Sequence, residues 1–151
     1  MRRIPVGRAD ALAITFLTAV VFAAFGPAWA AGGLFFELDT LKQNAPFTEY
    51  AAASIRGGEL PLWNPYLAAG FPQFAEGQTG VFPPVTLPFL ALGAAEPLLV
   101  WGPPIRSLLA ALAAFAFARV LRIAAPSSAL AGLVYGLGSF AVAQQHHFNI
   151  V

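Results

Sequence analysis

The stretch ALAITFLTAVVFAAFGPAWAAGGLFF, residues 11–36, contains no charged side chain. About 20 consecutive apolar residues are enough to cross the hydrocarbon core of a bilayer. The stretch therefore predicts a first transmembrane helix over residues 11–31. Arg2, Arg3 and Arg8 precede it. Because basic flanks stay on the cytoplasmic side, the N-terminus is predicted to be cytoplasmic and the helix to run outward.

A cleavable signal peptide is the competing interpretation of this segment. Its start is basic, and AWA (residues 28–30) fits a small-x-small cleavage site. The apolar run continues with Leu34, Phe35 and Phe36 beyond that site, and further hydrophobic segments follow. These features favour a helix that is retained in the membrane.

The composition of the whole chain also points to a membrane protein. Hydrophobic residues make up 58% of the chain, charged residues make up 10%, and the mean hydropathy is +0.70. A soluble domain carries about a quarter charged residues, so this chain has too little polar surface to cover itself in water. The absence of cysteine excludes disulfides, thiolate metal sites and a cysteine nucleophile.

Two further hydrophobic segments predict a second and a third span. The second is expected over residues 103–123, because the proline pair at its start suits the first turn of a helix. Arg119 and Arg122 close it on the cytoplasmic side, where their long side chains reach the headgroups. The third is expected over residues 127–145 and would finish outside.

Close helix packing is predicted for the third segment, which carries Gly132 and Gly136. Such a small-xxx-small pair lets two helices approach closely. The sequence thus predicts an all-α membrane protein with about three transmembrane helices. The chain ends in apolar sequence without a closing signal, so we expect residues 1–151 to be a single N-terminal fragment of a longer polytopic domain.

Residues 32–102 are predicted to form one large external loop. Most of the acidic residues lie there, in agreement with the positive-inside rule. Residues 44–56 predict a short interfacial helix with one apolar-aromatic face, capped by Asn44 and ended by the glycine pair that follows. Residues 85–95 predict a short re-entrant or interfacial helix, because prolines interrupt this part too often for a span.

The external loop contains the uncharged stretch PLWNPYLAAGFP, residues 61–72. Trp63 and Tyr66 suit the aromatic belt of a membrane interface. Each proline restricts the residue before it to extended conformations. A loop with so little freedom suits a site that must hold groups toward a substrate, and we predict Trp63 and Asn64 as substrate-binding residues.

Asp39 is the candidate catalytic residue, because it follows the outer end of the first predicted helix. One interpretation is a carboxylate that helps to start a helix at Thr40. The other is a general base or metal ligand at the membrane surface, since a partly dehydrated pocket raises the pKa of a carboxyl toward the range useful for proton transfer. Glu37 would point elsewhere and is the weaker candidate.

The role of Arg106 depends on where the second helix begins. A start at Pro97 places Arg106 near mid-membrane, where a charge is costly and functional by default. A start at Pro103 places it in the first turn at the outer headgroup level. There its planar guanidinium group could bind a lipid phosphate, or the side chain could simply reach the headgroups. We predict Arg106 as a substrate-binding residue.

His146 and His147, followed by Asn149, mark the outer end of the third predicted span. A histidine pair there could bind phosphate, share a metal or exchange protons. Adjacent histidines on a helix point about 100° apart, so they seldom hold one ion together. Polar residues at a membrane boundary are the simpler interpretation. His146 and His147 are predicted to bind substrate, and no metal site is assigned.

Several short motifs follow one another along the chain: DTLKQNAPF (39–47), IRGGELPLWNPYLAAGFP (55–72), QTGVFPP (78–84), and GLVYGLGSF with the later HHFN (132–149). In this order they resemble the N-terminal part of the YfhO-like bacterial membrane proteins. The resemblance spans about residues 35–149. Its most specific part is G-x-L-P-x-W-N-P followed by G-x-P.

This family is similar to the membrane glycosyltransferases of the C-type superfamily, which have many transmembrane helices and use polyprenyl-phosphate-linked sugars. The resemblance implies the N-terminal part of such a fold in the bacterial inner membrane, with the external loop shaping the active site. It implies that Asp39 takes a proton from the acceptor hydroxyl, or orients the acceptor, while the sugar is displaced from phosphate. We add the hypothesis that Arg106 or the histidine pair stabilises the negative charge that develops on the leaving phosphate.

The alternative is a non-catalytic polytopic membrane protein, either a piece of a transporter or an assembly scaffold. The loop would then be a lid or a docking surface. The expected partners are membrane lipids, the polyprenyl-phosphate sugar and the remaining helices of a longer chain, and no nucleic acid. Whether a divalent metal serves as a cofactor is left open.

Overall fold

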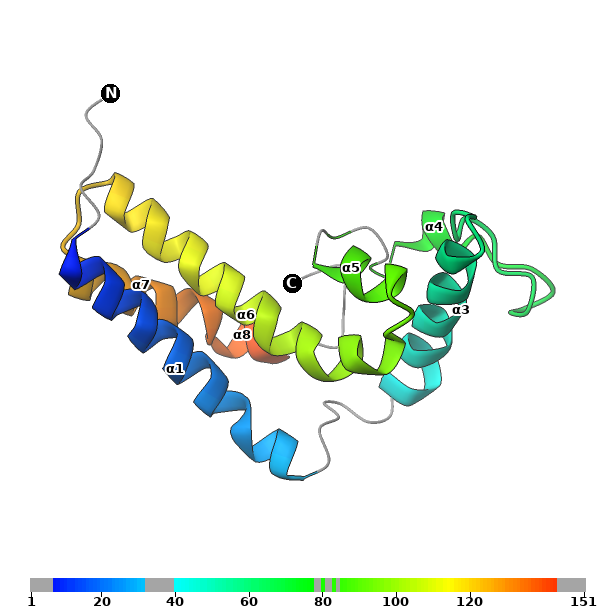
Figure 1. Ribbon diagram of the computed structural model, residues 1–151, viewed down its shortest axis with the longest axis horizontal. Helices are drawn as coiled ribbons and strands as arrows, with labels where there is room; N and C mark the ends of the chain where they lie inside the picture. Colours follow the sequence, from blue (N-terminus) through cyan, green and yellow to red (C-terminus); the bar gives the residue numbers. More distant parts are fainter. Residues whose placement is uncertain (1–6, 32–39, 78–79, 81–82, 84, 144–151) are drawn as a thin grey trace. The chain divides into compact units, whose positions relative to one another are not determined.

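The computed structural model describes residues 7–31, 40–77, 80, 83 and 85–143 (Figure 1). Apart from one isolated antiparallel bridge, the regular elements of these residues are helices, as the sequence predicts. The chain divides into two compact units. The first unit contains Met1–Ala30 and Pro104–Ala143, and the second contains Ala31–Pro103 and Gln144–Val151.

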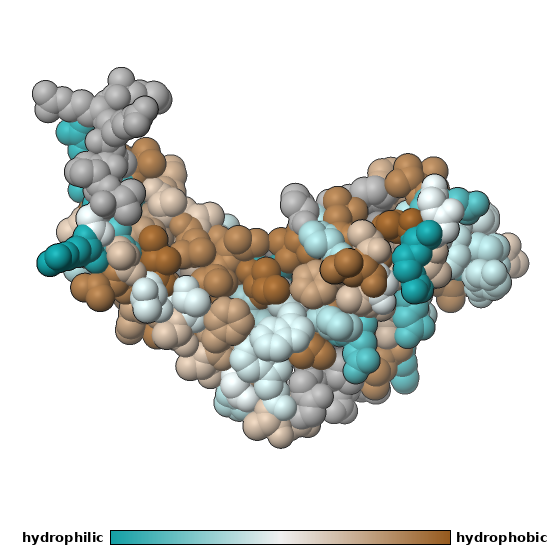
Figure 2. All heavy atoms as spheres, in the orientation of Figure 1, coloured by the Kyte–Doolittle hydropathy of each residue, from teal (hydrophilic) through white to brown (hydrophobic). Residues whose placement is uncertain are grey.

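Two of the described helices are long and apolar enough to cross a membrane: α1 (Arg8–Ala30) and α6 (Ala95–Val120). The most apolar part of α1 has a mean hydropathy of 2.0, yet only 22% of it is buried. Figure 2 shows hydrophobic residues over much of the visible surface of these helices. Soluble monomers rarely expose contiguous apolar surface of this kind, so by length and composition both helices suit a bilayer.

The third predicted span is not one helix. It contains α7 (Ala125–Gly136) and α8 (Ser139–Ala143), which are separated at Leu137 and Gly138. The 12 residues of α7 rise by about 18 Å, which is short of a hydrocarbon core of about 30 Å. The expectation of one continuous helix from residue 127 is therefore wrong, and residues 144–145 lie outside the described part.

The second predicted span begins earlier than expected, since α6 starts at Ala95 rather than at Pro103. Pro97 lies in the first turn, where a missing N–H costs nothing. Pro103 and Pro104 lie in the helix interior, where proline usually breaks a helix. Apolar sequence flanks them on both sides. The two prolines remove two backbone hydrogen bonds from the helix. In apolar surroundings a non-helical backbone would leave a larger number of N–H and C=O groups without a hydrogen bond.

Close packing around Gly132 and Gly136 is confirmed within the first unit. A Cβ added at Gly132 would lie 2.7 Å from the carbonyl oxygen of Ala111 on α6 and 3.2 Å from the side chain of Leu17 on α1. A Cβ at Gly136 would lie 2.6 Å from the carbonyl oxygen of Ser107. The three helices therefore meet at positions where only a hydrogen atom fits.

The second unit contains short helices: the π-helical turn η1 (Thr40–Asn44), α3 (Ala45–Arg56), α4 (Gln73–Glu76) and α5 (Thr86–Ala91). The helices predicted over 44–56 and 85–95 are thus present, although the second ends at residue 91. Their core is a cluster of buried side chains, Ala51, Ala52, Leu90 and Leu98. The predicted cap at Asn44 is wrong, because its backbone is already helical and its side chain makes no capping hydrogen bond.

Three helices end in the same hydrogen-bonding pattern, in which a residue with positive φ follows the last turn. At the end of α3 the residue is Gly58 (φ 80°), and at the end of α5 it is Gly93 (φ 68°). At the end of α6 it is Arg122 (φ 63°), where Ile123 N donates to Ala118 O at 3.1 Å. This is the Schellman arrangement, whose positive-φ residue is usually glycine.

Candidate functional site

The loop between α3 and α4 is closed by hydrogen bonds within its own backbone. The backbone of Asn64 pairs with that of Phe71 through two hydrogen bonds of 2.7 and 2.8 Å, which form the isolated antiparallel bridge. The ring of Phe71 stacks on Phe47 of α3, with centroids 5.6 Å apart and planes inclined by 9°. The loop is therefore fixed both to itself and to the neighbouring helix.

A chain of buried side-chain amides holds this loop from inside. Asn64 Nδ2 donates to Gln73 Oε1 at 2.9 Å, and Gln73 Nε2 donates to the carbonyl oxygen of Phe47 at 2.9 Å. Asn64 Oδ1 accepts from the backbone N–H of Tyr66 at 3.0 Å. Asn64 is 2% exposed and Gln73 is 0% exposed. Buried polar groups stabilise only when they are paired in this way.

The aromatic side chains of the loop are held in place but remain accessible. Trp63 is 56% exposed and Tyr66 is 84% exposed. Tyr50 of α3 donates its hydroxyl to the carbonyl oxygen of Trp63 at 2.7 Å, and its ring meets that of Tyr66 edge-on at 6.0 Å. A Cβ added at Gly70 would lie 2.5 Å from the Trp63 ring. The indole thus lies directly against the backbone of Gly70.

The backbone is strained at the tip of the loop, next to the contact between Gly70 and the indole of Trp63. Ala68 and Ala69 have φ values of 48° and 63°, and Gly70 has 120°. The left-handed region costs an L-residue about 1–2 kcal/mol. Observed strain of this kind is found at sites where the chain must present a particular surface. The surface presented here is that of Trp63 and Tyr66, which we name the aromatic platform.

The predicted site residues are distributed as follows. Trp63 and Asn64 lie together in this loop of the second unit, but only Trp63 offers its side chain to a ligand, and the burial of Asn64 favours a structural role. Arg106 belongs to the first unit and is 6% exposed. Since α6 begins at Ala95, Arg106 lies near the middle of the helix, about 16 Å from its first residue. This start resolves the two interpretations of Arg106 in favour of a mid-helix position. The remaining predicted residues, Asp39, Glu37, His146, His147 and Asn149, lie outside the described residues.

An ion pair in the first unit was not foreseen from the sequence. Arg119 Nε donates to Asp10 Oδ1 at 2.6 Å, and the backbone N–H of Gly7 donates to Asp10 Oδ2 at 3.0 Å. Asp10 is 5% exposed. The pair joins the start of α1 to the end of α6, so the two helices run in opposite directions. The available signal was one acid in the first turn of a span and a basic residue in the last turn of the next.

The described residues offer no group of three His, Cys, Asp or Glu side chains that could hold a metal ion. Comparison with known proteins gives no assignment either. The chain matches no family model, no curated protein and no solved structure.

Removing the Asn64 side chain is expected to loosen the loop. Asn64→Ala removes its hydrogen bonds to Gln73 Oε1, which is buried, and to the Tyr66 N–H, which is partly buried; together these losses cost about 2 kcal/mol. Hydrogen exchange of the backbone amides of residues 62–74 should then be about 30-fold faster. Leu60→Ala, at a residue that is 64% exposed, is the control and should leave exchange unchanged. Equal protection in both variants would contradict the structural role of Asn64.

Proposed function

We propose that the chain is the N-terminal part of a YfhO-like glycosyltransferase of the bacterial inner membrane, with a cytoplasmic N-terminus and the loop of residues 32–102 outside. It transfers a sugar from a polyprenyl-phosphate donor. The ordered sequence motifs and the two membrane-compatible helices support this proposal.

The proposed reaction is a displacement at the anomeric carbon of the donor sugar. The acceptor hydroxyl oxygen forms a bond to that carbon, and the bond from the carbon to the phosphate oxygen breaks. The electron pair of the broken bond leaves with the polyprenyl phosphate, and the hydroxyl proton passes to Asp39. A cation from Arg106 or His146–His147 offsets the charge that develops on the phosphate.

The observation that carries the proposal is the aromatic platform. An exposed indole face, fixed against Gly70 and attached to a loop with a fully paired interior, is a ready surface for the apolar face of a sugar ring. Little conformational entropy is lost when such a surface binds a ligand. The platform lies in the segment that the resemblance assigns to the active site.

The proposal is tested with the full-length protein, purified in bilayer nanodiscs, and a radiolabelled polyprenyl-phosphate sugar. Binding of the donor, and release of labelled product when an acceptor hydroxyl is supplied, are expected. A sample that is folded by circular dichroism but neither binds nor turns over the donor would refute the proposal and favour the non-catalytic alternative.

Trp63→Ala is expected to weaken sugar binding without unfolding the loop. The lost stacking surface corresponds to about 1.5 kcal/mol, or about a tenfold increase in Kd for the donor or acceptor sugar. Phe74→Ala is the matched control, because Phe74 is also aromatic and 52% exposed but is not part of the platform. Hydrogen exchange of the loop should stay at the wild-type rate in both variants. An unchanged Kd in Trp63→Ala would remove the platform from sugar recognition.

A further inference from the structure

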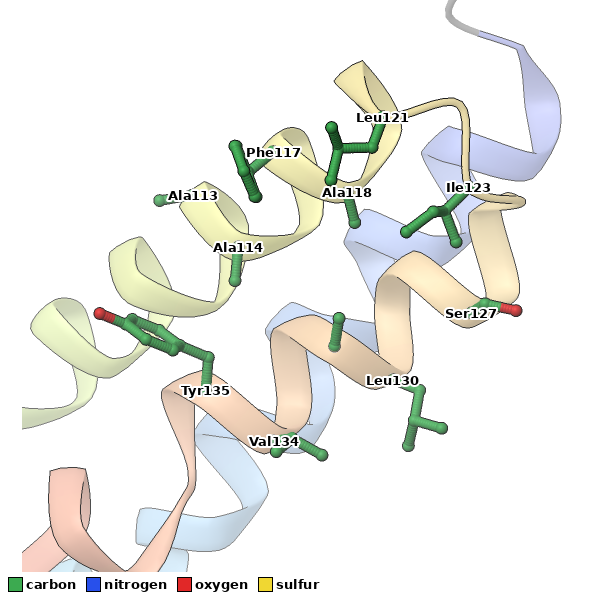
Figure 3. Close-up of a pocket in the computed structure, with 11 residues that line it drawn as sticks. Ala113, Ala114, Phe117, Ala118, Leu121, Ile123, Ser127, Leu130, Val134 and Tyr135 are labelled. Carbon is green, nitrogen blue, oxygen red and sulfur yellow. The ribbon is translucent and has the colours of Figure 1, made fainter.

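An open apolar groove of about 880 Å³ lies between α6 and α7 of the first unit (Figure 3). Most of its lining side chains are Ala, Phe, Leu, Ile and Val, and its polar members are Ser127 and Tyr135. Phe117, Leu130 and Val134 are each more than 60% exposed. Figure 3 shows these side chains along the two helices, with α1 behind them. The groove is therefore apolar and open at the surface of the unit.

One end of this groove lies next to an exposed arginine in the sequence. Leu121 and Ile123 line that end, and Arg122 lies between them in the sequence. Arg122 is exposed, and its side chain forms no ion pair or hydrogen bond with any residue in the described part of the chain. Arg119, by contrast, is engaged with Asp10 and with the carbonyl oxygen of Ile123.

The start of α7 also has a positive character. Ser127 lies in the first turn of α7 and lines the groove. The N-terminus of a helix carries a partial positive charge, and hydroxyl groups there can donate to an anion. The groove thus has a hydroxyl and a helix N-terminus at one end, where Arg122 stands between two lining residues in the sequence, and apolar side chains line the rest.

Arg122 also has a left-handed backbone conformation, which is unfavourable for a residue other than glycine. The chain ends α3 and α5 with glycine in the same hydrogen-bonding pattern, but it ends α6 with arginine at φ 63°. A non-glycine residue in this region is strained, and such an outlier supports a functional hypothesis. The charge of Arg122 is the property that glycine would lack.

We propose that this groove binds an anionic phospholipid, with the phosphate at Arg122 and Ser127 and one acyl chain extending toward Tyr135. From Ser127 to Tyr135 the helix rises by about 12 Å, which is most of one hydrocarbon leaflet of about 15 Å. Within a bilayer, every acyl chain is as apolar as the groove. The headgroup contact therefore determines which lipid is selected.

Fluorescence quenching tests this selection, because the chain has no cysteine and a single introduced one is labelled specifically. Ala113→Cys lines the groove and carries a bimane label in phosphatidylcholine nanodiscs. Traces of tail-brominated phosphatidylglycerol should quench it about fivefold more than tail-brominated phosphatidylcholine, the factor expected of one arginine near an anionic lipid. Leu12→Cys on α1, at a residue that is 71% exposed, is the control and should be quenched equally by both lipids.

Substitutions of Arg122 distinguish an effect of its charge on lipid preference from an effect on the stability of the fold. Arg122→Gly suits the positive φ, so the thermal midpoint should not fall, yet the preference for phosphatidylglycerol at residue 113 should disappear. Arg122→Lys should retain it. A preference that survives in Arg122→Gly would overturn the proposal. So would the absence of quenching by both lipids at residue 113 alone, because a second copy or another helix would then cover the groove. Loss of the preference on adding inorganic phosphate would overturn it as well, by indicating a simple anion site.

Discussion

Gly136→Leu is expected to separate α6 from α7 and to lower the free energy of unfolding by about 3 kcal/mol. A Cβ at this position would lie 2.6 Å from both the Cβ of Ala111 and the carbonyl oxygen of Ser107. The backbone of α6 cannot move aside without losing its other contacts with α7. Helix association in lipid depends on this close approach, since no hydrophobic driving force acts between apolar surfaces there.

Two measurements check this result. Denaturation with sodium dodecyl sulfate gives the change in stability, and spin labels at Leu109→Cys and Leu130→Cys report the distance between α6 and α7. The labelled distance should lengthen and broaden in Gly136→Leu. Gly26→Leu is the matched control, because a Cβ at Gly26 meets nothing within 4 Å. An unchanged distance and midpoint in Gly136→Leu would contradict the close packing of α7 against α6 at Gly136.

Asp39→Asn is expected to lower sugar transfer by about 10²- to 10⁴-fold, the contribution of a positioned general base. The amide has a similar shape but cannot take the acceptor proton. Binding of the donor should change little, because the proposed role of Asp39 is in the chemical step. Turnover of a labelled polyprenyl-phosphate sugar in nanodiscs gives the rate, and equilibrium binding of the same donor gives its Kd.

Two further variants control the Asp39 experiment. Glu49→Gln removes a carboxylate that is exposed on α3, and its activity should equal that of the wild type. Asp39→Glu keeps the carboxylate and should retain part of the rate. Wild-type turnover by Asp39→Asn, at an equal amount of folded protein, would exclude Asp39 from catalysis while leaving the donor-binding test of the aromatic platform intact.

Local spacing in the sequence predicted some of the helical elements and one close helix contact. The apolar run after Arg8 predicts α1, and the interval between Gly132 and Gly136 predicts a close helix contact. The glycine pair after α3 predicts its end, which forms at Gly58 (φ 80°), although Gly57 itself is helical. In each case the determining residues lie in one continuous stretch of sequence, so a local window is enough to predict the feature.

The features that the sequence did not reveal depend on distant partners or on competing local structures. Gln73 gains its role from Phe47, which is 26 residues away. Asn44 fails as a cap because it is the last residue of η1, and its φ and ψ are already −69° and −39°. The proline pair in α6 predicts a helix start because proline suits the first helical turn, but the helix begins eight residues before Pro103, at Ala95. Burial and distant pairing override such local preferences.

The bond between Asp10 and Arg119 has a consequence for biosynthesis. The two residues are 109 positions apart, and ribosomes add about 5–20 residues per second. The first helix therefore waits roughly 5–20 s before its carboxylate meets the guanidinium that neutralises it. During that interval Asp10 lacks its guanidinium partner, so we expect that end of the first helix to stay in contact with water until the later helix is made.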